Sequence, residues 1–278
     1  MYFRGFFALV TASTIAACTL FSGLDGYTDT TPDSEAGATD ATGGDGGTND
    51  ATTPQNDGST SDGATATGFC ATMATAALCA DFDGLDPLAG WAQTTNPGAE
   101  FEIADAGRSA PNAIRATVVN SNADRGAFIT RTLKDSVSHA RLSYSLFVEE
   151  RPADFEIETN MLRLNGCPNG CVSEFFVAIR NGDSQFAEQA WDASEPIANY
   201  HTLGGAIPTG KWVRIGFEID ILGTKEMALT VDGVEIARKP LSLVAPGIPS
   251  LQAGISYANK ATPNGIILVD DVVIEVLP

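Results

Sequence analysis

Hydrophobic and polar residues alternate strictly along residues 212–221, near the end of the chain. The apolar positions of this run, which share one face, are Val213, Ile215, Phe217, Ile219 and Ile221. Strict alternation over this length predicts a β-strand with one buried face, because successive side chains of a strand point to opposite sides.

A hairpin follows this strand. Asp232 and Gly233 lie between two alternating apolar runs, residues 227–231 and 234–237. Asp-Gly between such runs is a strong hairpin signal, because a type I′ turn needs a positive φ at both central positions. A two-residue loop would pair Val231 with Val234 and Leu229 with Ile236. The runs 251–257 and 266–276 come next, and we expect this whole end of the chain to form an antiparallel meander.

Short strand-like runs also fill the earlier part of the chain, from about residue 78. They are residues 78–83, 100–104, 113–119, 127–133, 140–148, 156–164, 172–179 and 185–191. Turn signals separate them, and no run of 12 or more residues beyond the N-terminal segment has helical period. Many short strands at this spacing predict an all-β fold, a two-sheet antiparallel sandwich.

The N-terminal segment, residues 1–17, has the pattern of a secretory signal peptide: Arg4, then an apolar run too short to span a bilayer. It ends in Ile15-Ala16-Ala17-Cys18, which resembles the lipobox of bacterial lipoproteins. The resemblance implies cleavage before Cys18 and lipidation of that cysteine, and Thr19 after it favours the outer membrane. We therefore expect an exported, lipid-anchored protein of the cell envelope. An ordinary signal peptide cut near Ala17 is the alternative.

Residues 18–67 differ sharply in composition from the C-terminal three quarters of the chain. They are rich in Gly, Ala, Thr and Ser and carry nine acidic and no basic residues. Low hydrophobicity with charge of one sign predicts a disordered tether. Residues 68–278, about 210 residues, suit a single β-sandwich. This part holds 26 acidic and 15 basic residues of a chain with net charge −19, which argues against nucleic acid as a partner.

Several short motifs in residues 69–277 have an order and spacing that resemble bacterial laminin-G-like (concanavalin A-like) jelly-roll domains. The motifs are residues 79–84, 109–115, 211–215, 230–234 and 268–273. The resemblance implies a jelly-roll sandwich. It does not imply one function, because that superfamily includes lectins, carbohydrate-binding modules, glycan hydrolases and adhesion modules.

Four cysteines lie in the predicted domain: Cys70, Cys79, Cys167 and Cys171. An exported chain meets an oxidising compartment, so we expect the disulfides Cys70–Cys79 and Cys167–Cys171. A zinc site with four thiolates is the alternative. Such sites usually use two closely spaced pairs, and only Cys167 and Cys171 have that spacing.

Four aspartates are the candidate metal ligands: Asp81, Asp83, Asp270 and Asp271. In related jelly rolls the first and last strands pair, so the resemblance implies that these side chains meet. Clustered carboxylates suit a structural Ca²⁺ ion, which prefers six to eight oxygen ligands. The alternative is that each aspartate accepts hydrogen bonds from turn backbone.

No catalytic residues are predicted. The β-glucanases of the same superfamily carry Glu-x-Asp-x-(x)-Glu on one strand, and alternation places these acids on one face. Glu218 and Asp220 share a face here, but Leu222 stands at the next in-phase position. Residues 156–158 repeat the pattern, with Asn160 next in phase. Both runs are interpreted as solvent-facing strand surface.

Four aromatic residues are candidates for stacking on a sugar: Trp91, Trp191, Tyr200 and Tyr257. Trp191 and Tyr200 flank a loop-like stretch, where exposed residues tend to carry recognition. Aromatic residues of a sandwich also serve in the core. The sequence therefore favours a non-catalytic binding or adhesion module, with carbohydrate such as an envelope polysaccharide as the candidate ligand. A glycan-active enzyme and a purely structural envelope component are the alternatives.

Overall fold

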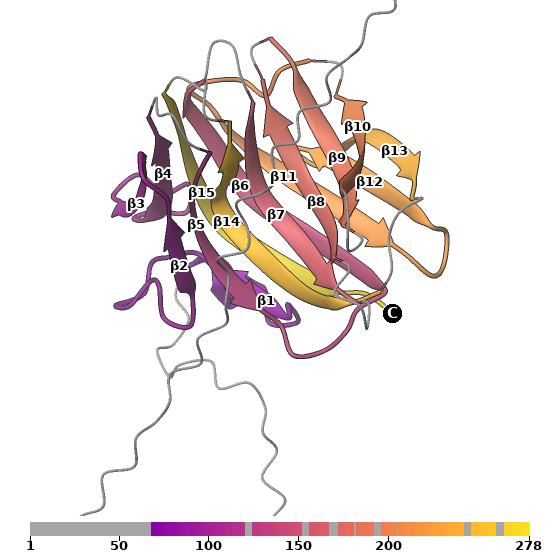
Figure 1. Cartoon of the computed structure of the whole chain (residues 1–278). Coiled ribbons are helices and arrows are strands. Elements are labelled where there is room, and N and C mark those ends of the chain that lie inside the picture. Colours follow the sequence, from indigo (N-terminus) through magenta and orange to yellow (C-terminus); the bar gives the residue numbers. More distant parts are fainter. Residues whose placement is uncertain are drawn as a thin grey trace, which may run out of the picture. The chain divides into compact units, whose positions relative to one another are not determined.

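Two antiparallel β-sheets packed face to face form the part of the chain that the computed structural model describes (Figure 1). The described residues are 68–119, 124–151, 156–166, 172–180, 182–191, 196–203, 205–241, 246–259 and 264–278. A short 3₁₀ helix, η1 (Phe69–Thr72), precedes the strands. The strands are β1 (Leu78–Ala80), β2 (Ala92–Thr95), β3 (Ala99–Ala104), β4 (Ala113–Val118), β5 (Arg125–Thr132), β6 (His139–Glu150), β7 (Ile157–Asn165), β8 (Val172–Ile179), β9 (Ser184–Trp191), β10 (Pro196–Thr202), β11 (Trp212–Asp220), β12 (Glu226–Val231), β13 (Val234–Pro240), β14 (Ile248–Ala258) and β15 (Gly265–Val276).

The eight-stranded sheet has the order β13-β12-β11-β6-β15-β4-β3, and β1 pairs with β15 on the same side as β4. The seven-stranded sheet has the order β10-β9-β8-β7-β14-β5-β2. These pairings are antiparallel, which confirms the predicted all-β sandwich of two sheets. No helix among the described residues is long and apolar enough to cross a membrane.

The core lies between the sheets and is built from the predicted apolar faces. The inward residues of β6 are Ala140, Leu142, Tyr144, Leu146 and Val148, all buried. The ring of Phe217 on β11 meets Tyr144 edge to face at 5.9 Å and Phe186 of the opposite sheet at 5.0 Å. Aromatic contacts across the two layers thus hold the sheets together.

The predicted C-terminal meander is correct only for β11, β12 and β13. Strand β14 lies between β7 and β5 in the other sheet, and β15 lies between β6 and β4. Both strands are buried along nearly their whole length, whereas the edge strand β13 is largely exposed. Each of these two strands is central in its sheet, with a paired strand at both edges. Strands that follow one another along the chain therefore need not be neighbours in a sheet.

The hairpin between β12 and β13 differs from its predicted register by one bulge. Asp232 and Gly233 have φ values of 50° and 80°, as a type I′ turn requires, and Val231 pairs with Val234. The register then shifts between Leu229 and Thr230, so Leu229 pairs with Ala237. The prediction that Leu229 pairs with Ile236 is wrong, because the bulge places Ala237 opposite Leu229; Ile236 is 40% exposed.

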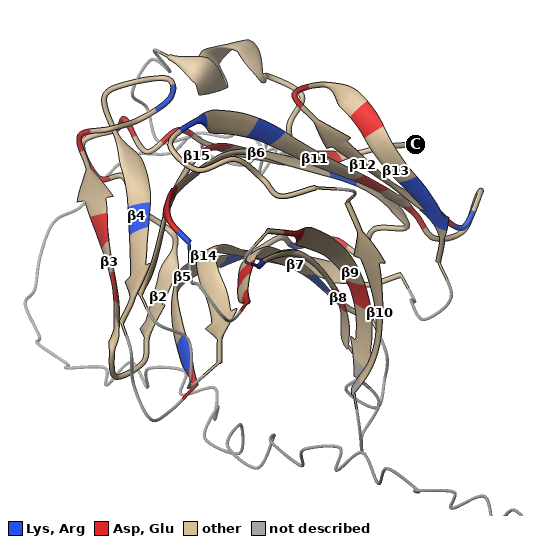
Figure 2. Cartoon of the chain, turned by 90° about the horizontal axis from the view of Figure 1, so that it is seen from above, with Lys and Arg blue, Asp and Glu red and all other residues tan. Residues whose placement is uncertain are grey.

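Both sheets curve in the same direction, and the seven-stranded sheet lies on the inside of the curve (Figure 2). The face of this sheet that points away from the core is therefore concave, and we call it the concave face. Its middle is formed by β7, β8 and β9, with β14 on one side and β10 on the other.

Candidate binding face

A bulge in β7 decides which of its side chains reach the concave face. Thr159 and Leu162 are buried, but the register with β8 shifts between them. Asn160 sits in this shift with a φ of 50°. As a result Met161, and not Asn160, is the next residue after Glu158 to point to the concave face.

The centre of the concave face is apolar. Met161, Phe176, Ala178 and Ala187 form a small buried cluster that is separate from the main core. Tyr200 of β10 lies opposite Ala187, and its ring meets that of Phe176 at 6.1 Å with an interplanar angle of 75°. Tyr200 is still 41% exposed, so the apolar centre ends in an accessible aromatic ring.

Glu158 lies beside this apolar centre and directly opposite Tyr257 of β14. Its side chain is only 9% exposed. Burial raises the pKa of Glu158 well above its usual value, and the nearby carboxylates of Glu156 and Glu174 raise it further, while Arg180 opposes them. Its position therefore favours the protonated form of Glu158.

Two ion pairs border Glu158. The guanidinium of Arg180 contacts Oε2 of Glu156. The Nε of Arg163 lies 3.0 Å from Oε1 of Glu174, an ion pair without the angle of a hydrogen bond. The amide of Gln189 donates to Oε2 of Glu174 at 3.1 Å. Each of these arginines thus forms an ion pair with a glutamate, and the concave face is polar around its apolar centre.

The two tyrosines of the concave face are neutral hydrogen-bonding groups. Burial, together with the nearby carboxylates, raises the pKa of both Tyr200 and Tyr257. The guanidinium of Arg180 lies 5.7 Å from the ring centroid of Tyr200. Each tyrosine offers an aromatic ring and a hydroxyl, the combination that suits partly wet binding surfaces.

The four predicted stacking residues do not lie together. Tyr200 and Tyr257 are on the concave face, while Trp91 is 8% exposed and belongs to the main core. The Trp91 ring packs 6.1 Å from that of Phe82, so its prediction as a ligand-stacking residue is wrong. An indole just before an edge strand can fill the end of a sandwich instead. The backbone of Trp191 pairs with β8, and its side chain lies outside the described atoms.

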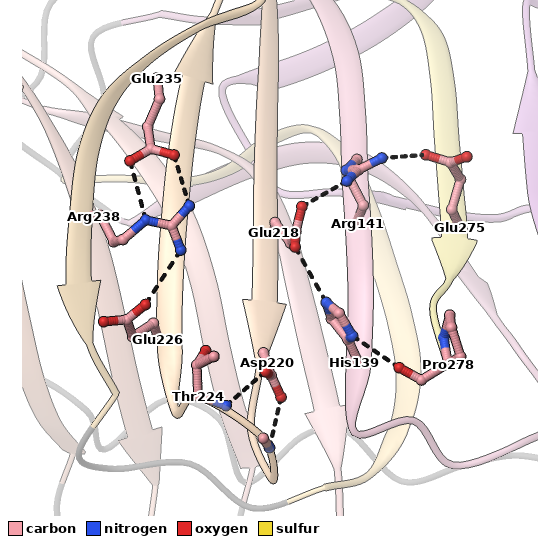
Figure 3. Close-up of polar contacts among 11 residues, drawn as sticks. His139, Arg141, Glu218, Asp220, Thr224, Glu226, Glu235, Arg238, Glu275 and Pro278 are labelled. Carbon is pink, nitrogen blue, oxygen red and sulfur yellow. Dashed lines mark hydrogen bonds and ion pairs between the residues drawn. The ribbon is translucent and has the colours of Figure 1, made fainter.

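The carboxylates of β11 lie on the outer face of the eight-stranded sheet, away from the concave face (Figure 3). Arg141 donates to Glu218 at 2.6 Å, and His139 lies 3.2 Å from the same carboxylate. These contacts hold the pKa of Glu218 below its usual value. Asp220 accepts hydrogen bonds from the backbone N–H groups of residues 223–224. Both acids are occupied by structural contacts, which agrees with their interpretation as strand surface.

The predicted pairing of the first and last strands is present, and it explains where Asp270 lies. Strand β15 pairs with β4 as far as Val269 and with β1 from Val272 onward. Asp270 sits at this junction, fully buried, and its Oδ2 accepts from the backbone N–H groups of Arg108 at 2.8 Å and Ser109 at 3.1 Å. Burial raises the pKa of Asp270 to about 6.

Asp271 follows with a φ of 53°, and its Oδ2 accepts from the hydroxyl of Ser145 at 3.0 Å. Its Oδ1 is buried and, within the described part of the chain, has no hydrogen-bond partner. Asp81 accepts from the N–H of Cys70 at 3.1 Å, and Asp83 accepts from the N–H of Asn112 at 2.9 Å.

Backbone hydrogen bonds of this kind were the alternative to a metal site. Within the described residues, no group of three or more His, Cys, Asp or Glu side chains is arranged to hold a metal ion. Calcium at Asp81, Asp83, Asp270 and Asp271 therefore stays a prediction.

The disulfide Cys70–Cys79 is present and joins η1 to β1, as predicted. Cys18, Cys167 and Cys171 lie outside the described residues.

Sequence reasoning considered Glu158 only as strand surface and did not single out Arg163, Glu174 or Arg180. A signal was available: three glutamates and two arginines interrupt the alternating apolar runs of residues 156–180. Charged residues between buried positions of two paired strands mark a polar patch on their shared outer face.

No protein-family model and no curated protein matches this sequence. Solved structures do match the fold. The endo-β-1,4-glucuronan lyase of the fungus Trichoderma reesei has a TM-score of 0.56 at 12% identity, covering 73% of this chain and 96% of that one. The cellulose induced protein Cip1 has a TM-score of 0.51 at 12% identity, covering 71% and 96%. A carbohydrate esterase of a Shiga toxin-encoding bacteriophage has a TM-score of 0.50 at 14% identity, covering 73% and 99%.

Identities this low establish the fold and nothing finer. The described part of the chain therefore has a concanavalin A-like jelly-roll fold.

Proposed function

We propose that the concave face binds a carbohydrate chain and that the protein is a non-catalytic binding module. The observation that carries this proposal is the placement of Tyr200 and Tyr257 on one curved face, with the apolar cluster of Met161 and Phe176 between their strands. Aromatic rings stack on the apolar faces of sugars, and their hydroxyls reach the sugar oxygens.

The polar groups around the tyrosines also suit a saccharide. Sites for small polar ligands combine apolar surface with a few placed hydrogen-bonding groups. The concave face offers amides from Gln189 and Gln252 and the carboxyl groups of Glu158 and Glu174, each less than 10% exposed. Burial already restricts these side chains, so they lose little entropy when they bind a ligand.

A glycan-active enzyme is the second candidate, and Glu158 favours it. Burial raises the pKa of Glu158, whereas the nearby Glu156 is paired with Arg180, so these two acids have different environments, as acid–base catalysis requires. The bulge at Asn160 places Met161 at the next in-phase position, where the pattern Glu-x-Asp-x-x-Glu would have its third acid. The apolar Met161 favours binding over hydrolysis.

A glycan array with the purified chain tests the proposal, followed by calorimetry on each hit. We expect Tyr200→Ala and Tyr257→Ala each to weaken binding about tenfold, and Tyr200→Phe to retain most of it, because the ring stays. Unchanged affinity in both alanine variants would contradict the proposed face. Release of new saccharide ends that stops in Glu158→Gln would favour the enzyme instead.

We also propose that the protein is exported and anchored in the cell envelope, in the outer membrane, by a lipid on Cys18. The support is the lipobox-like sequence of residues 15–18. Metabolic labelling with a clickable fatty acid tests it: we expect the native chain to be labelled and to fractionate with outer membranes. Label that persists in Cys18→Ser would refute the anchor at this residue.

A further inference from the structure

Glu158 differs from the other two glutamates of the concave face because it has no arginine of its own. Glu156 is paired with Arg180, and Glu174 is paired with Arg163. Across the described residues, no hydrogen bond or ion pair holds the carboxyl group of Glu158, although the residue is only 9% exposed. A buried polar group without a partner is costly, so this carboxyl group suits a ligand.

The direction of the Glu158 side chain follows from its neighbours. It lies opposite Ala178, a member of the apolar cluster on the concave face, and opposite Tyr257. Its charge also acts on the hydroxyl of Tyr200, which lies further across the sheet on β10. The carboxyl group of Glu158 therefore points to the proposed sugar site and not into the core.

The charges around this carboxyl group favour a cationic partner. Three glutamates face two arginines, so an ionised Glu158 leaves this part of the face with one excess negative charge. An anionic saccharide would meet this excess charge, while both arginines are already paired. A cation would meet an unpaired carboxylate and the ring of Tyr257, which also favours positive charge.

We propose that the saccharide bound on the concave face carries a free primary amine, and that the carboxylate of Glu158 receives its ammonium group beside Tyr257. The ligand class is an amino sugar without an N-acetyl group. This inference rests on the proposed function, because it names the kind of saccharide that the same face takes.

Binding of such a ligand has a defined proton balance. Burial raises the pKa of Glu158 in the free protein, and a bound ammonium group lowers it by stabilising the carboxylate. Binding of a sugar whose amine is already protonated therefore shifts Glu158 toward its ionised form and releases protons to solvent. The other titratable and charged groups that face Glu158 are Glu156, Glu174, Arg163, Arg180, Tyr200 and Tyr257, with Asp124 beside Tyr257. The arginines keep their charge and the tyrosines stay neutral, so the affinity rises with pH until the sugar amine itself loses its proton.

Calorimetry with three matched hexasaccharides tests this inference: β-1,4-linked glucosamine, its N-acetylated form, and the glucose equivalent. We expect glucosamine to bind at least tenfold more tightly than the other two and, in two buffers of different ionisation enthalpy, to release a proton. Glu158→Gln keeps the size and neutral charge of the protonated acid. This variant should bring the three affinities within about twofold, and the matched variant Glu102→Gln, on an exposed part of the other sheet, should leave them unchanged.

The outcomes separate this inference from the proposed function. If the three saccharides bind equally to the native chain, the amine inference is overturned and carbohydrate binding stands. If none of these saccharides binds and the glycan array is also blank, the proposed function itself fails. A glucosamine preference that persists in Glu158→Gln also overturns the role of Glu158. Proton release by the native chain needs no variant, so a poorly folded Glu158→Gln does not block the test.

Discussion

The side-chain oxygen of Asn160 accepts a hydrogen bond of 3.0 Å from the backbone N–H of Gly254. Asn160 lies at the bulge of β7, and Gly254 lies on β14 where the register between these two strands shifts. The contact replaces the interrupted backbone ladder at this point. Beyond it, Ile255 lies opposite Thr159, and after a second shift Tyr257 lies opposite Glu158. The arrangement of the concave face therefore depends on this irregular pair.

Gly254→Ala should destabilise the protein strongly. Gly254 has a φ of 119°, and an added Cβ would lie 2.4 Å from the carbonyl oxygen of Ala127. Strain and clash together should lower the free energy of unfolding by about 2–4 kcal/mol, measured by urea denaturation. Gly182→Ala is the control, because its φ is 75° and no described atom lies within 4 Å of the added Cβ. A loss as large in the control would show that the close contact is unimportant.

Loss of the disulfide should destabilise the segment that covers the outer face of the eight-stranded sheet. The bond Cys70–Cys79 holds η1, and the ring of Phe69 covers the guanidinium of Arg214 at 5.0 Å. We expect Cys70→Ser with Cys79→Ser to lower the free energy of unfolding by roughly 2–3 kcal/mol, the entropy of closing a loop of this size. Phe69→Ala, with the disulfide intact, measures the effect of losing the ring over Arg214 alone. Equal stability of the double variant and the native chain would contradict the expectation.

The alternation of apolar residues predicted most of the fold because most strands bury one face. It placed β6 and β11 correctly, including their inward side chains. It missed the edge strands β2 and β10, since the residues of β2 are mostly exposed and carry no apolar period. The placement of β14 and β15 in different sheets depends on long-range packing, which the local pattern does not contain.

The candidate site was predicted only in part, for a different physical reason. Tyr200 and Tyr257 were predicted as ligand-binding residues, and both lie on the concave face. Glu158 was interpreted as solvent-facing strand surface. Alternation predicts on which face of the sheet a side chain lies. It does not predict the curvature of the sheet or the size of the neighbouring side chains, and these two features bury Glu158. The bulge at Asn160 also has no signal in a single sequence, because nothing local requires it.

The stability of the protein should fall as the pH rises through the titration of Asp270. Burial raises its pKa from 3.8 to about 6 in the folded chain, so the folded state binds more protons than the unfolded state between these values. The favourable contribution is complete below about pH 4 and is lost as the pH rises through 6, on the order of 3 kcal/mol. Urea denaturation from pH 4 to 7, with chelator present throughout, measures it.

Asp270→Asn is the matched variant for this pH dependence. Its amide does not titrate, so the part of the slope between pH 4 and 6 that belongs to Asp270 should disappear, whatever the stability of the variant at any single pH. Parallel slopes for the native chain and the variant would show that Asp270 does not titrate in this range.

Removal of Arg163 should be far more costly than removal of Arg238, although both make ion pairs. The partner of Arg163 is Glu174, whose side chain is 5% exposed, whereas the partners of Arg238 are Glu226 and Glu235, at 37% and 46% exposed (Figure 3). Arg163→Met leaves a buried carboxylate without its cation and should lower the free energy of unfolding by about 2 kcal/mol.

Arg238→Met should cause no measurable change, because water replaces an exposed ion pair at little cost. Urea denaturation of the two variants side by side makes the comparison. Equal losses of stability in the two variants would contradict the prediction that the burial of Glu174 sets the cost of losing its arginine.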